Sequence, residues 1–477
     1  MENLGTFDQL FYKANQYQVM SLIMGGASIL APARKGGRLN AQVIADHLAA
    51  RLGEIPLLRA KFIQDPLRLG TVKKLPNPDF DIAKHVTVVS LAKPGNYEQL
   101  SARLGELSAQ PLELECLWRW TVIGGLKGGK LAIFCKIHHA LADGIGITQV
   151  LSSIYDPEPV KPEKPRPRVP SFEEEPSAAS LLGGAVVESL RRLWVKTPRF
   201  LMKNTGPVLS SLGSGARELW ENRNDPNGGF VMPEMNPTSL NTSEFSGRRA
   251  VSWKTLSLAE VKRTAKRFSC TVNDVGLLLY SYAMQHYFEQ TGESIDFDLW
   301  CGMPMSTRTS AHGEGGNQVT VGRICLHNTI ENPLERLRAI NVDSLEVKQA
   351  ARPEEPLLDM EEVADLMVPL VMDGMFFVAG KLNLMGRAGD SFAPANGIFS
   401  NVPGPPKPVC VANAVMEESI PMIPAVDILA VSGGITSVAD ALTIGFHCDG
   451  GVVEQPDLFV KGIERGLKAL QDAGVEQ

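Results

Sequence analysis

Residues 130–139 alternate cleanly between two sets of side chains, and residues 145–155 follow with apolar positions at helical spacing. Because strand side chains alternate between the faces of a sheet, this run predicts a strand that turns tightly into a helix. One face carries Leu131, Ile133, Cys135, Ile137 and His139, and the other carries Phe134, Lys136 and His138. The two adjacent histidines are therefore predicted to point in opposite directions.

Helix-start patterns organise the second half of the chain. Ser257 with Glu260 predicts a capping box ahead of an amphipathic helix, and Thr271 with Asp274 predicts the start of a longer apolar helix. Near the C-terminus, Pro456 stands where a further helix begins. The buried stripe of that last helix is predicted to comprise Ile463, Leu467 and Leu470. Each half thus mixes strands with helices, which predicts an α/β fold.

A proline-rich segment separates the two halves. Asp156–Pro176 contains seven prolines among charged residues, and proline fixes φ and removes a backbone donor, so the segment reads as an extended linker. Residues 178–220 then predict helix, either a strap packed across both halves, the favoured interpretation, or a basic amphipathic contact with lipid. We predict an N-terminal half over residues 1–158, a linker and strap over 159–245, and a C-terminal half over 246–477. A site is expected in the cleft between the halves.

The composition of the chain limits the classes of binding partner that we expect. The 477-residue chain has 53 acidic and 47 basic residues, and this net charge of -6 gives no basic surplus that would favour nucleic acid. Its seven cysteines include no C-x-x-C pair, which suits a reducing compartment and predicts neither a disulfide framework nor a zinc site. The N-terminus lacks the basic and apolar regions of a signal peptide. We therefore predict a cytoplasmic protein.

The apolar segment Leu366–Gly386 is about as long as a helix that crosses a membrane. Pro369, Asp373 and Lys381 interrupt it within a stretch that would barely cross a bilayer. A buried helix, or a helix lying on a lipid surface, is the favoured interpretation. If the substrates are lipids, the protein meets them from outside the bilayer, peripherally at the inner membrane face or at lipid inclusions.

The histidine pair is the strongest candidate for chemistry. His139 stands at the end of the predicted strand, and Asp143 follows one turn later, beside Gly144. An alcohol is too weak an acid to attack a thioester unaided, whereas an imidazole, with an ordinary pKa of about 6.5, can accept its proton during the attack. Asp143 can hold the loop by pairing with an arginine, which leaves His139 neutral and oriented.

Two other interpretations of this motif stay open at this point. The histidines and the aspartate could bind a metal ion, although opposite strand faces and the lack of further clustered ligands argue against it. A buried histidine and a helix-capping aspartate could also have no catalytic role. The seven-residue pattern alone does not decide between that interpretation and catalysis.

The motif is accompanied by others in a consistent order. His138–Gly144 resembles the active-site signature of bacterial wax ester synthase/diacylglycerol acyltransferases, which share a superfamily with chloramphenicol acetyltransferase and the condensation domains of peptide synthetases. Val272–Val275 resembles the family's Asn-Asp motif, and Ser400–Pro405 resembles a later conserved segment. The likeness runs from about Phe7 to Leu470 and also includes Leu75–Pro94, Gln110–Trp118, and a block with Pro304, Ser306, Arg308, Gly316 and Asn317.

The resemblance implies two chloramphenicol-acetyltransferase-like α/β domains with an active-site tunnel at their interface. Acyl-CoA would enter from one side as a substrate and the acceptor from the other, with no metal and no permanently bound cofactor. His139 would be the general base and Asp143 structural, with His138 and Gly144 completing the motif. The residues implied to bind substrate or support the site are Asn273, Asp274, Arg308, Ser400 and Asn401.

Most of these supporting residues also have a plain structural interpretation. Asn273 and Asp274 stand at a helix N-terminus, where both residue types are favoured as caps, so structural support is favoured over direct catalysis. Arg308 could pair with Asp143 or hold CoA phosphates. Ser400–Pro405 predicts a strand running into a rigid proline loop that shapes the domain interface.

Three segments depart from the family's pattern. Val19–Gly26 stands where the family has Pro-Met-His-x-Gly-Gly, and Cys116 replaces a proline before Leu117 and Trp118. Late in the chain, Ser437–Asp440 replaces Ser-Tyr-x-Gly. None of these departures removes the candidate base. They make the acceptor the least secure inference from the resemblance.

We therefore predict a long-chain O-acyltransferase that moves an acyl group from acyl-CoA to a fatty alcohol or diacylglycerol, giving a wax ester or triacylglycerol. One alternative keeps the fold and the base but uses a short alcohol, a polyketide or an amine as acceptor. Another is a non-catalytic lipid-surface protein. The predicted partners are acyl-CoA and the acceptor, with peripheral contact to a membrane or lipid droplet, and no nucleic acid.

Overall fold

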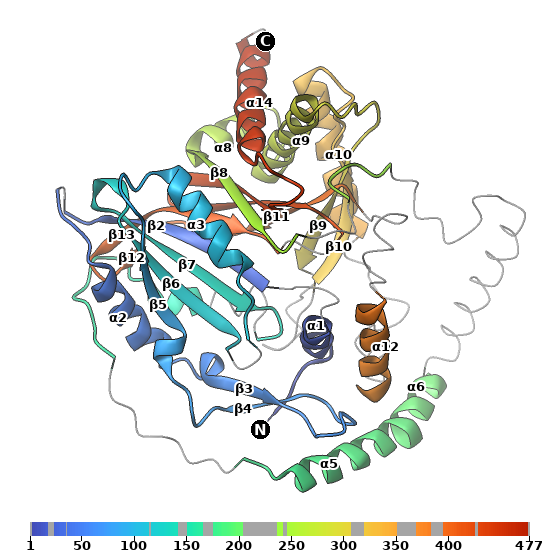
Figure 1. Cartoon of the computed structure of the whole chain (residues 1–477). Helices are drawn as coiled ribbons and strands as arrows, with labels where there is room; N and C mark the ends of the chain where they lie inside the picture. Colours follow the sequence, from blue (N-terminus) through green and yellow to red (C-terminus); the bar gives the residue numbers. More distant parts are fainter. Residues whose placement is uncertain are drawn as a thin grey trace, which may run out of the picture.

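Two six-stranded sheets form the frame of the molecule, and a three-stranded sheet lies beside the first (Figure 1). The structure is a computed structural model. It describes residues 2–17, 23–34, 36–113, 116–141, 150–165, 175–203, 236–241, 246–306, 319–350, 369–382, 395–424 and 428–475. Within these ranges the mixed α/β fold class predicted from the sequence is confirmed.

The first large sheet is completed by strands from the far end of the chain. Most of its neighbouring strands are antiparallel, and β5 and β6 are parallel. In spatial order its strands are β12 (Cys410–Val411), β13 (Ala414–Met422), β2 (Ile23–Pro32), β7 (Leu131–His138), β6 (Trp118–Gly124) and β5 (Val86–Ser90). Because β13 pairs with β2 along its length, the two halves share a sheet in addition to a surface.

The second large sheet is built from residues after 248. Its strands are β10 (Val319–Cys325), β9 (Trp300–Ser306), β11 (Gly397–Val402), β14 (Val431–Val438), β15 (Ala441–Asp449) and β8 (Arg249–Ser257). The strand β11 lies parallel to both of its neighbours, and the other pairs are antiparallel. The small sheet contains β1 (Glu2–Asn3), β4 (Lys73–Pro76) and β3 (Ala60–Ile63).

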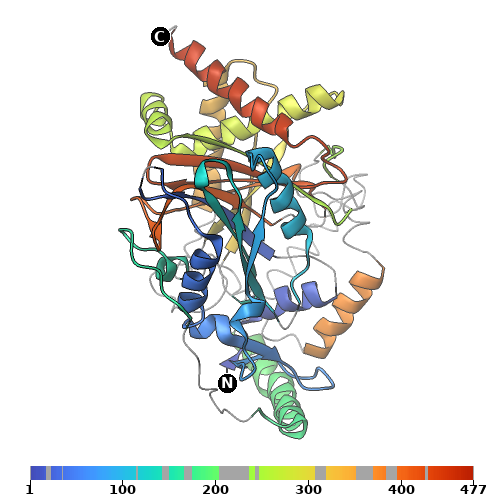
Figure 2. The ribbon, with the colours of Figure 1, turned by 60° about the vertical axis from the view of Figure 1, so that its left-hand side comes forward.

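Helices cover the outer faces of both sheets (Figures 1 and 2). On the first sheet, α2 (Ala41–Leu52) packs on one face and α3 (Tyr97–Ala109) lies on the side toward β8. The second sheet is covered by α8 (Leu258–Arg267), α9 (Val272–Thr291), α10 (Pro333–Ala350) and α14 (Asp457–Val475). These four helices lie at the end of the molecule that holds the C-terminus.

The strand β7 confirms the alternation predicted for residues 130–139. The side chains of Leu131, Ile133 and Ile137 belong to the core beneath α2, whereas Ala132 and Phe134 belong to the core beneath α3. A strand between two apolar layers buries both faces, so both sets of alternate residues are apolar until the strand ends. Of the helix predicted to follow, residues 150–154 are helical, and the preceding residues lie outside the described ranges.

The predicted helix starts of the second half are also confirmed. The Ser257 hydroxyl accepts from the Glu260 amide at the start of α8. At the start of α9 the full capping box forms, with the Thr271 hydroxyl accepting from the Asp274 amide and the Asp274 carboxylate accepting from the Thr271 amide. Pro456 directly precedes α14, and Ile463 and Leu470 on that helix are buried as predicted.

Three further helical segments lie at the end of the molecule that holds the N-terminus. They are α1 (Thr6–Gln16), α12 (Pro369–Lys381) and a continuous run of α5 (Ala178–Arg191), a π-helical turn (Arg192–Lys196) and α6 (Thr197–Lys203). The run packs on the first half, where the Ser189 hydroxyl donates to the Leu69 carbonyl. Among the described helices, none combines the length and the apolarity that a membrane crossing requires.

Candidate active site

His138 ends strand β7 and is completely buried. Its Nδ1 accepts a hydrogen bond from the Ala140 amide at 3.0 Å, so the proton of the neutral ring resides on Nε2. Burial, and then the neighbouring His139, lower the pKa of His138 to about 4. A ring that is neutral and committed to the turn after the strand is suited to hold that turn, and this supports a structural role.

His139 is the first residue after β7 and is half-buried. Its ring packs edge-on against Phe11 of α1, with ring centroids 4.7 Å apart, while the neighbouring Tyr12 of α1 lies against His138 with centroids 6.4 Å apart. One helix therefore contacts both histidines. This edge contact restricts the rotation of the His139 ring.

The position of α1 is fixed in turn by a buried ion pair with α12. The Lys13 ammonium, which has no exposed surface, lies 2.5 Å from an Asp373 carboxylate oxygen and also donates to Gln64 at 2.8 Å. The second Asp373 oxygen accepts from the Tyr17 hydroxyl at 2.8 Å, and Arg68 contacts the same hydroxyl. Burial lowers the pKa of Lys13, and Asp373 partly offsets this effect. Local sequence patterns do not predict this network, because Lys13 and Asp373 are 360 residues apart.

A cavity of about 450 Å³ lies between the two halves. First-half residues at its wall include Lys136 and Ser108, and second-half residues include Arg249, Met422 and His447. Lys136 belongs to the Phe134 and His138 face of β7, so the cavity adjoins the face opposite to the one predicted for His139. The tunnel reaching His139 stays a prediction.

The cavity wall mixes apolar side chains with charged and polar groups that are held by hydrogen bonds. The Lys136 ammonium donates to the carbonyls of Leu107 and Gln110 at the end of α3, and burial lowers its pKa to about 8. The His447 ring joins the halves, because one of its nitrogens bonds the Ile423 carbonyl at 2.9 Å and the other bonds the Ser108 hydroxyl at 2.7 Å. Burial lowers the pKa of His447 to about 4, so it is neutral at pH 7.

The Asn-Asp pair lies at the start of α9, where its recorded contacts belong to the second half. The Asp274 carboxylate is buried and accepts from Thr271 and from the Asn341 amide at 2.7 Å. The Asn273 amide faces the Met303 sulfur at 3.8 Å. These contacts support the capping interpretation of Asp274, because they join α9 to its own start and to α10.

The other predicted site residues fall into two groups. Ser400 and Asn401 lie on β11, where Ser400 is half-buried and Asn401 is exposed, and the strand runs into the predicted proline loop. Asp143, Gly144 and Arg308 lie outside the described residues. The roles predicted for all five stay predictions.

Two of the departures from the family's pattern have identifiable contacts. Cys116 is buried in the turn before β6, and its sulfur lies 3.4 Å from the Trp118 carbonyl and 3.4 Å from the His85 ring nitrogen. Asp440 caps α8, because its carboxylate accepts from the Ala259 amide at 2.7 Å and from the Ser257 hydroxyl at 3.1 Å. Both substitutions therefore serve local structure.

Around the histidine pair the described residues hold no group with the composition of a metal site. One such group, Asp298, Cys325 and His327, lies at the edge of the second sheet. The described part of the site thus consists of a histidine pair oriented by an aromatic helix, beside an interdomain cavity. Two α/β halves that share a strand pair, with this histidine pair at the end of β7, form a fold of the chloramphenicol-acetyltransferase type.

Comparison with known families specifies the class. The wax ester synthase/diacylglycerol acyltransferase catalytic domain matches residues 4–276, and the C-terminal domain of the same family matches residues 315–471. The chain therefore belongs to the wax ester synthase/diacylglycerol acyltransferase family. The family and the acyltransferase activity predicted from the sequence are confirmed.

Individual relatives agree with this assignment. The chain is 28% identical to the probable diacylglycerol O-acyltransferase tgs1 of Mycobacterium tuberculosis, over 98% of this chain and 96% of that protein. It is 27% identical to the probable diacylglycerol O-acyltransferase Tgs4 of the same organism, over 82% and 81% of the two chains.

Solved structures show the same fold. The wax ester synthase/diacylglycerol acyltransferase of Marinobacter aquaeolei matches 99% of this chain and 100% of its own, with a TM-score of 0.69 and 21% identity. The starter condensation domain of rhizomide synthetase, in complex with C8-CoA, matches 99% and 95% with a TM-score of 0.52 and 13% identity. The predicted likeness to condensation domains is thus confirmed for the fold.

Proposed function

We propose that the chain transfers a long acyl group from acyl-CoA to the hydroxyl of a fatty alcohol or diacylglycerol, with His139 as general base. His139 takes the hydroxyl proton as the oxygen attacks the thioester carbonyl, and the collapse of the adduct expels CoA thiolate, which receives the proton. The carrying observation is the placement of His139 at the end of β7, half-buried and oriented by Phe11. No permanently bound cofactor is needed, because acyl-CoA is already activated.

The division of labour between the two histidines supports this assignment. His138 is held neutral and its Nδ1 is occupied by the Ala140 amide, so it fixes the turn. His139 follows it, with its ring held by an aromatic edge. A general base needs fixed geometry and a lone pair near the reacting hydroxyl, and a rigid neighbour supplies the first requirement.

CoA release with an acceptor panel tests the proposal. The wild-type chain is expected to release CoA from palmitoyl-CoA in the presence of hexadecanol or diolein, and His139→Ala is expected to lose about 10²–10⁴-fold in rate. Preference for a short alcohol or an amine would instead support the alternative acceptor class. An unchanged rate in His139→Ala would remove this residue from the mechanism.

We also propose that α5–α6 and α12 contact the lipid surface that holds the acceptor. Apolar side chains stand in solvent on both segments, led by Trp194 at 73% exposure and Met375 at 58%. A lone exposed apolar residue needs no explanation, but several on each of two helical segments at the same end of the molecule mark an interaction surface. The other exposed apolar residues there are Val186, Val187, Leu190, Leu193, Met202, Val371, Phe377, Val378 and Leu382.

Exposed basic residues accompany this surface and favour an anionic lipid face, namely Arg191, Arg199, Lys203 and Lys381. Liposome flotation of the double variant Trp194→Ser with Met375→Ser tests it, and the variant is expected to float several-fold less with anionic vesicles. Leu345→Ser is a matched control, because Leu345 is 48% exposed on α10 of the second half. Equal flotation of the wild type and the double variant would contradict this surface.

A further inference from the structure

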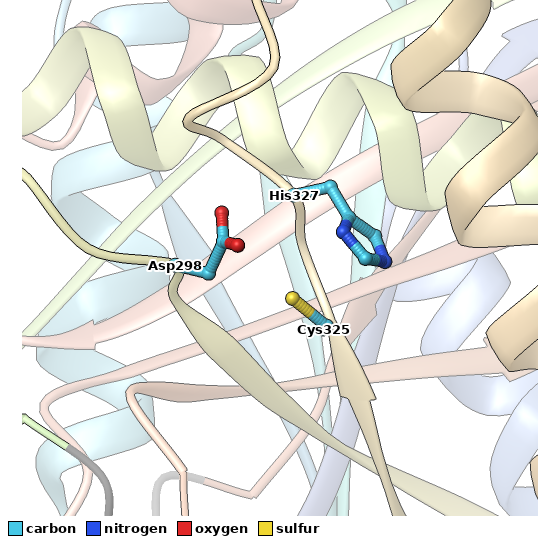
Figure 3. A group of neighbouring side chains, drawn as sticks. All are labelled: Asp298, Cys325 and His327. Atoms are coloured by element: carbon cyan, nitrogen blue, oxygen red, sulfur yellow. The ribbon is translucent and has the colours of Figure 1, made fainter.

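The second sheet carries a cluster of ligating side chains that plays no part in the proposed transfer. Asp298 precedes β9, Cys325 ends β10, and His327 lies in the turn that follows. Their carboxylate, thiol and imidazole atoms all lie within 4.8 Å of one another. Figure 3 shows the three side chains directed toward a common space at the end of the β9–β10 hairpin.

We propose that Asp298, Cys325 and His327 bind a divalent, borderline-soft metal ion of the zinc type. Sulfur, imidazole nitrogen and carboxylate oxygen are the three ligand types that zinc accepts in proteins, and water would fill a fourth tetrahedral position. Tetrahedral ligand atoms around zinc lie about 3.5 Å apart, so the present spacing has to close by about 1 Å. The side chains of Asp298 and His327 are only half-buried and can make this adjustment.

The ligands are oriented by further contacts, as metal ligands generally are. The His327 Nε2 lies 2.9 Å from a carboxylate oxygen of Asp343 on α10, which leaves Nδ1 for the metal. One Asp298 oxygen accepts from the Thr329 hydroxyl at 2.7 Å and from its amide at 3.2 Å, which leaves the second oxygen for the metal. This arrangement of a carboxylate behind a ligating histidine is a recurrent feature of zinc sites.

The backbone and the charge distribution agree with a cation site. His327 has a φ of +46°, in the left-handed region that a residue with a Cβ seldom adopts, and the strained turn directs its ring back toward Cys325. Two carboxylates, Asp298 and Asp343, face this group. The guanidinium of the nearby Arg336 donates hydrogen bonds to the carbonyls of Asn328 and Ile330 and to the Gln285 side chain.

The protonation of the thiol gives the site a chemical signature. A cysteine thiol has an ordinary pKa of about 8.5, so the sulfur of a metal-free site carries a proton at pH 7. Binding breaks the S–H bond, forms a sulfur–metal bond and releases that proton to the solvent, without any oxidation or reduction. We therefore expect about one proton released for each metal ion bound at pH 7.

The position of the cluster indicates what a bound ion would do. It joins the segment before β9, the end of β10 and, through Asp343, the helix α10. Because β10 is the edge strand of the second sheet in the described part of the chain, the metal would add a tie between the β9–β10 pair and the helix that covers it. The site is a structural one, and it is independent of the proposed transfer at His139.

Cobalt titration of the metal-stripped full chain tests the site. One equivalent of Co²⁺ is expected to give a thiolate-to-cobalt charge-transfer band, and Cys325→Ser is expected to abolish it. Cys301→Ser is the matched control, because Cys301 is a buried free cysteine on the adjacent strand β9. Asp343→Asn is expected to weaken binding about 10–100-fold while leaving the band in place at saturation.

A second measurement covers the case in which Cys325→Ser fails to fold. In the wild-type chain, Zn²⁺ should slow the alkylation of Cys325 in mild denaturant, where local opening exposes the buried thiol, as read by mass spectrometry of the peptide. Absence of both the band and the protection, or a band that survives in folded Cys325→Ser, would overturn the site. Removal of the metal should not change the rate of CoA release that the chain catalyses. Failure of this inference and failure of the proposed function can therefore be told apart.

Discussion

The two ends of the molecule bury very different side chains. Under the second sheet, α9 and α14 pack by aromatic stacking, with Tyr280 against Phe446 at 5.9 Å and Phe446 against Phe459 at 4.8 Å between ring centroids. Two charged groups buried there, Asp274 and Arg336, bond to a helix start and to loop carbonyls. At the end of β7, by contrast, the buried set includes His138 and the ion pair of Lys13 with Asp373. Apolar packing stabilises without further conditions, whereas a buried polar group costs free energy unless it is paired.

This difference indicates which region has been shaped by function. A fold can be stabilised by apolar cores alone, so a region that buries an ion pair and the His138 ring departs from the most stable solution. That departure coincides with the family's active-site motif. We infer that the second half acts mainly as scaffold, while the contact of α1 with the histidines trades stability for defined geometry.

The largest expected effect on stability comes from breaking the buried ion pair. Lys13→Met removes the nearer of two cations at the buried Asp373 carboxylate and leaves Arg68, 3.9 Å from its other oxygen. This should lower the free energy of unfolding by about 3–5 kcal/mol. The double variant Lys13→Met with Asp373→Leu should recover most of this loss, because a buried pair can be replaced by apolar groups at little cost. Chemical denaturation measures all three chains, and equal instability of the single and double variants would contradict the argument.

A somewhat smaller loss of stability is expected when the pH is lowered. The pKa of His447 is lowered to about 4, below its ordinary value of about 6.5, so its contribution to stability is complete above pH 6.5. It is lost as the pH falls from 6.5 to 4, because the unfolded chain binds the proton more readily, and the total amounts to about 3 kcal/mol.

The variant His447→Gln isolates this effect. Its free energy of unfolding should depend less steeply on pH between 6.5 and 4 than that of the wild type, as measured by denaturation at several pH values. The same proton would reverse the hydrogen bond that joins the halves, because a protonated His447 ring would donate to the Ser108 hydroxyl oxygen. An unchanged pH dependence would show that this ring is already accessible to protons in the folded chain.

The smallest effect is expected at the start of α9. Asp274→Asn keeps the size of the side chain but weakens its bonds to Thr271 and Asn341, at a cost of about 1–3 kcal/mol. Because Asp274 is assigned to helix capping, the rate of CoA release per folded molecule should stay close to that of the wild type. A rate loss comparable with that of His139→Ala would place Asp274 in the reaction.

Local patterns predicted the elements of the fold, and their limits are clear from particular cases. The alternation of β7 and the capping box of α9 involve residues within a few positions of each other, so the sequence displays them directly. The addition of β12 and β13 to the first sheet depends on pairing with β2 across most of the chain. Periodicity contains no information about such partners.

The site was predictable to a similar degree. The histidine motif is contiguous and was found, whereas the pairing of Lys13 with Asp373 and the packing of Phe11 on His139 join distant segments. The proposed metal ligands were missed for the same reason. Asp298 is far from Cys325 and His327 in sequence, and the spacing of the latter two matches no common zinc motif.

The central claim is that His139, and not His138, accepts the proton of the acceptor. The most direct measurement is single-turnover CoA release by His139→Asn and His138→Asn, compared at equal concentrations of folded protein. The asparagine at 138 retains an acceptor for the Ala140 amide, so that variant should keep most of the wild-type rate, while His139→Asn should lose about 10²–10⁴-fold. A large loss in His138→Asn with a normal rate in His139→Asn would contradict the account.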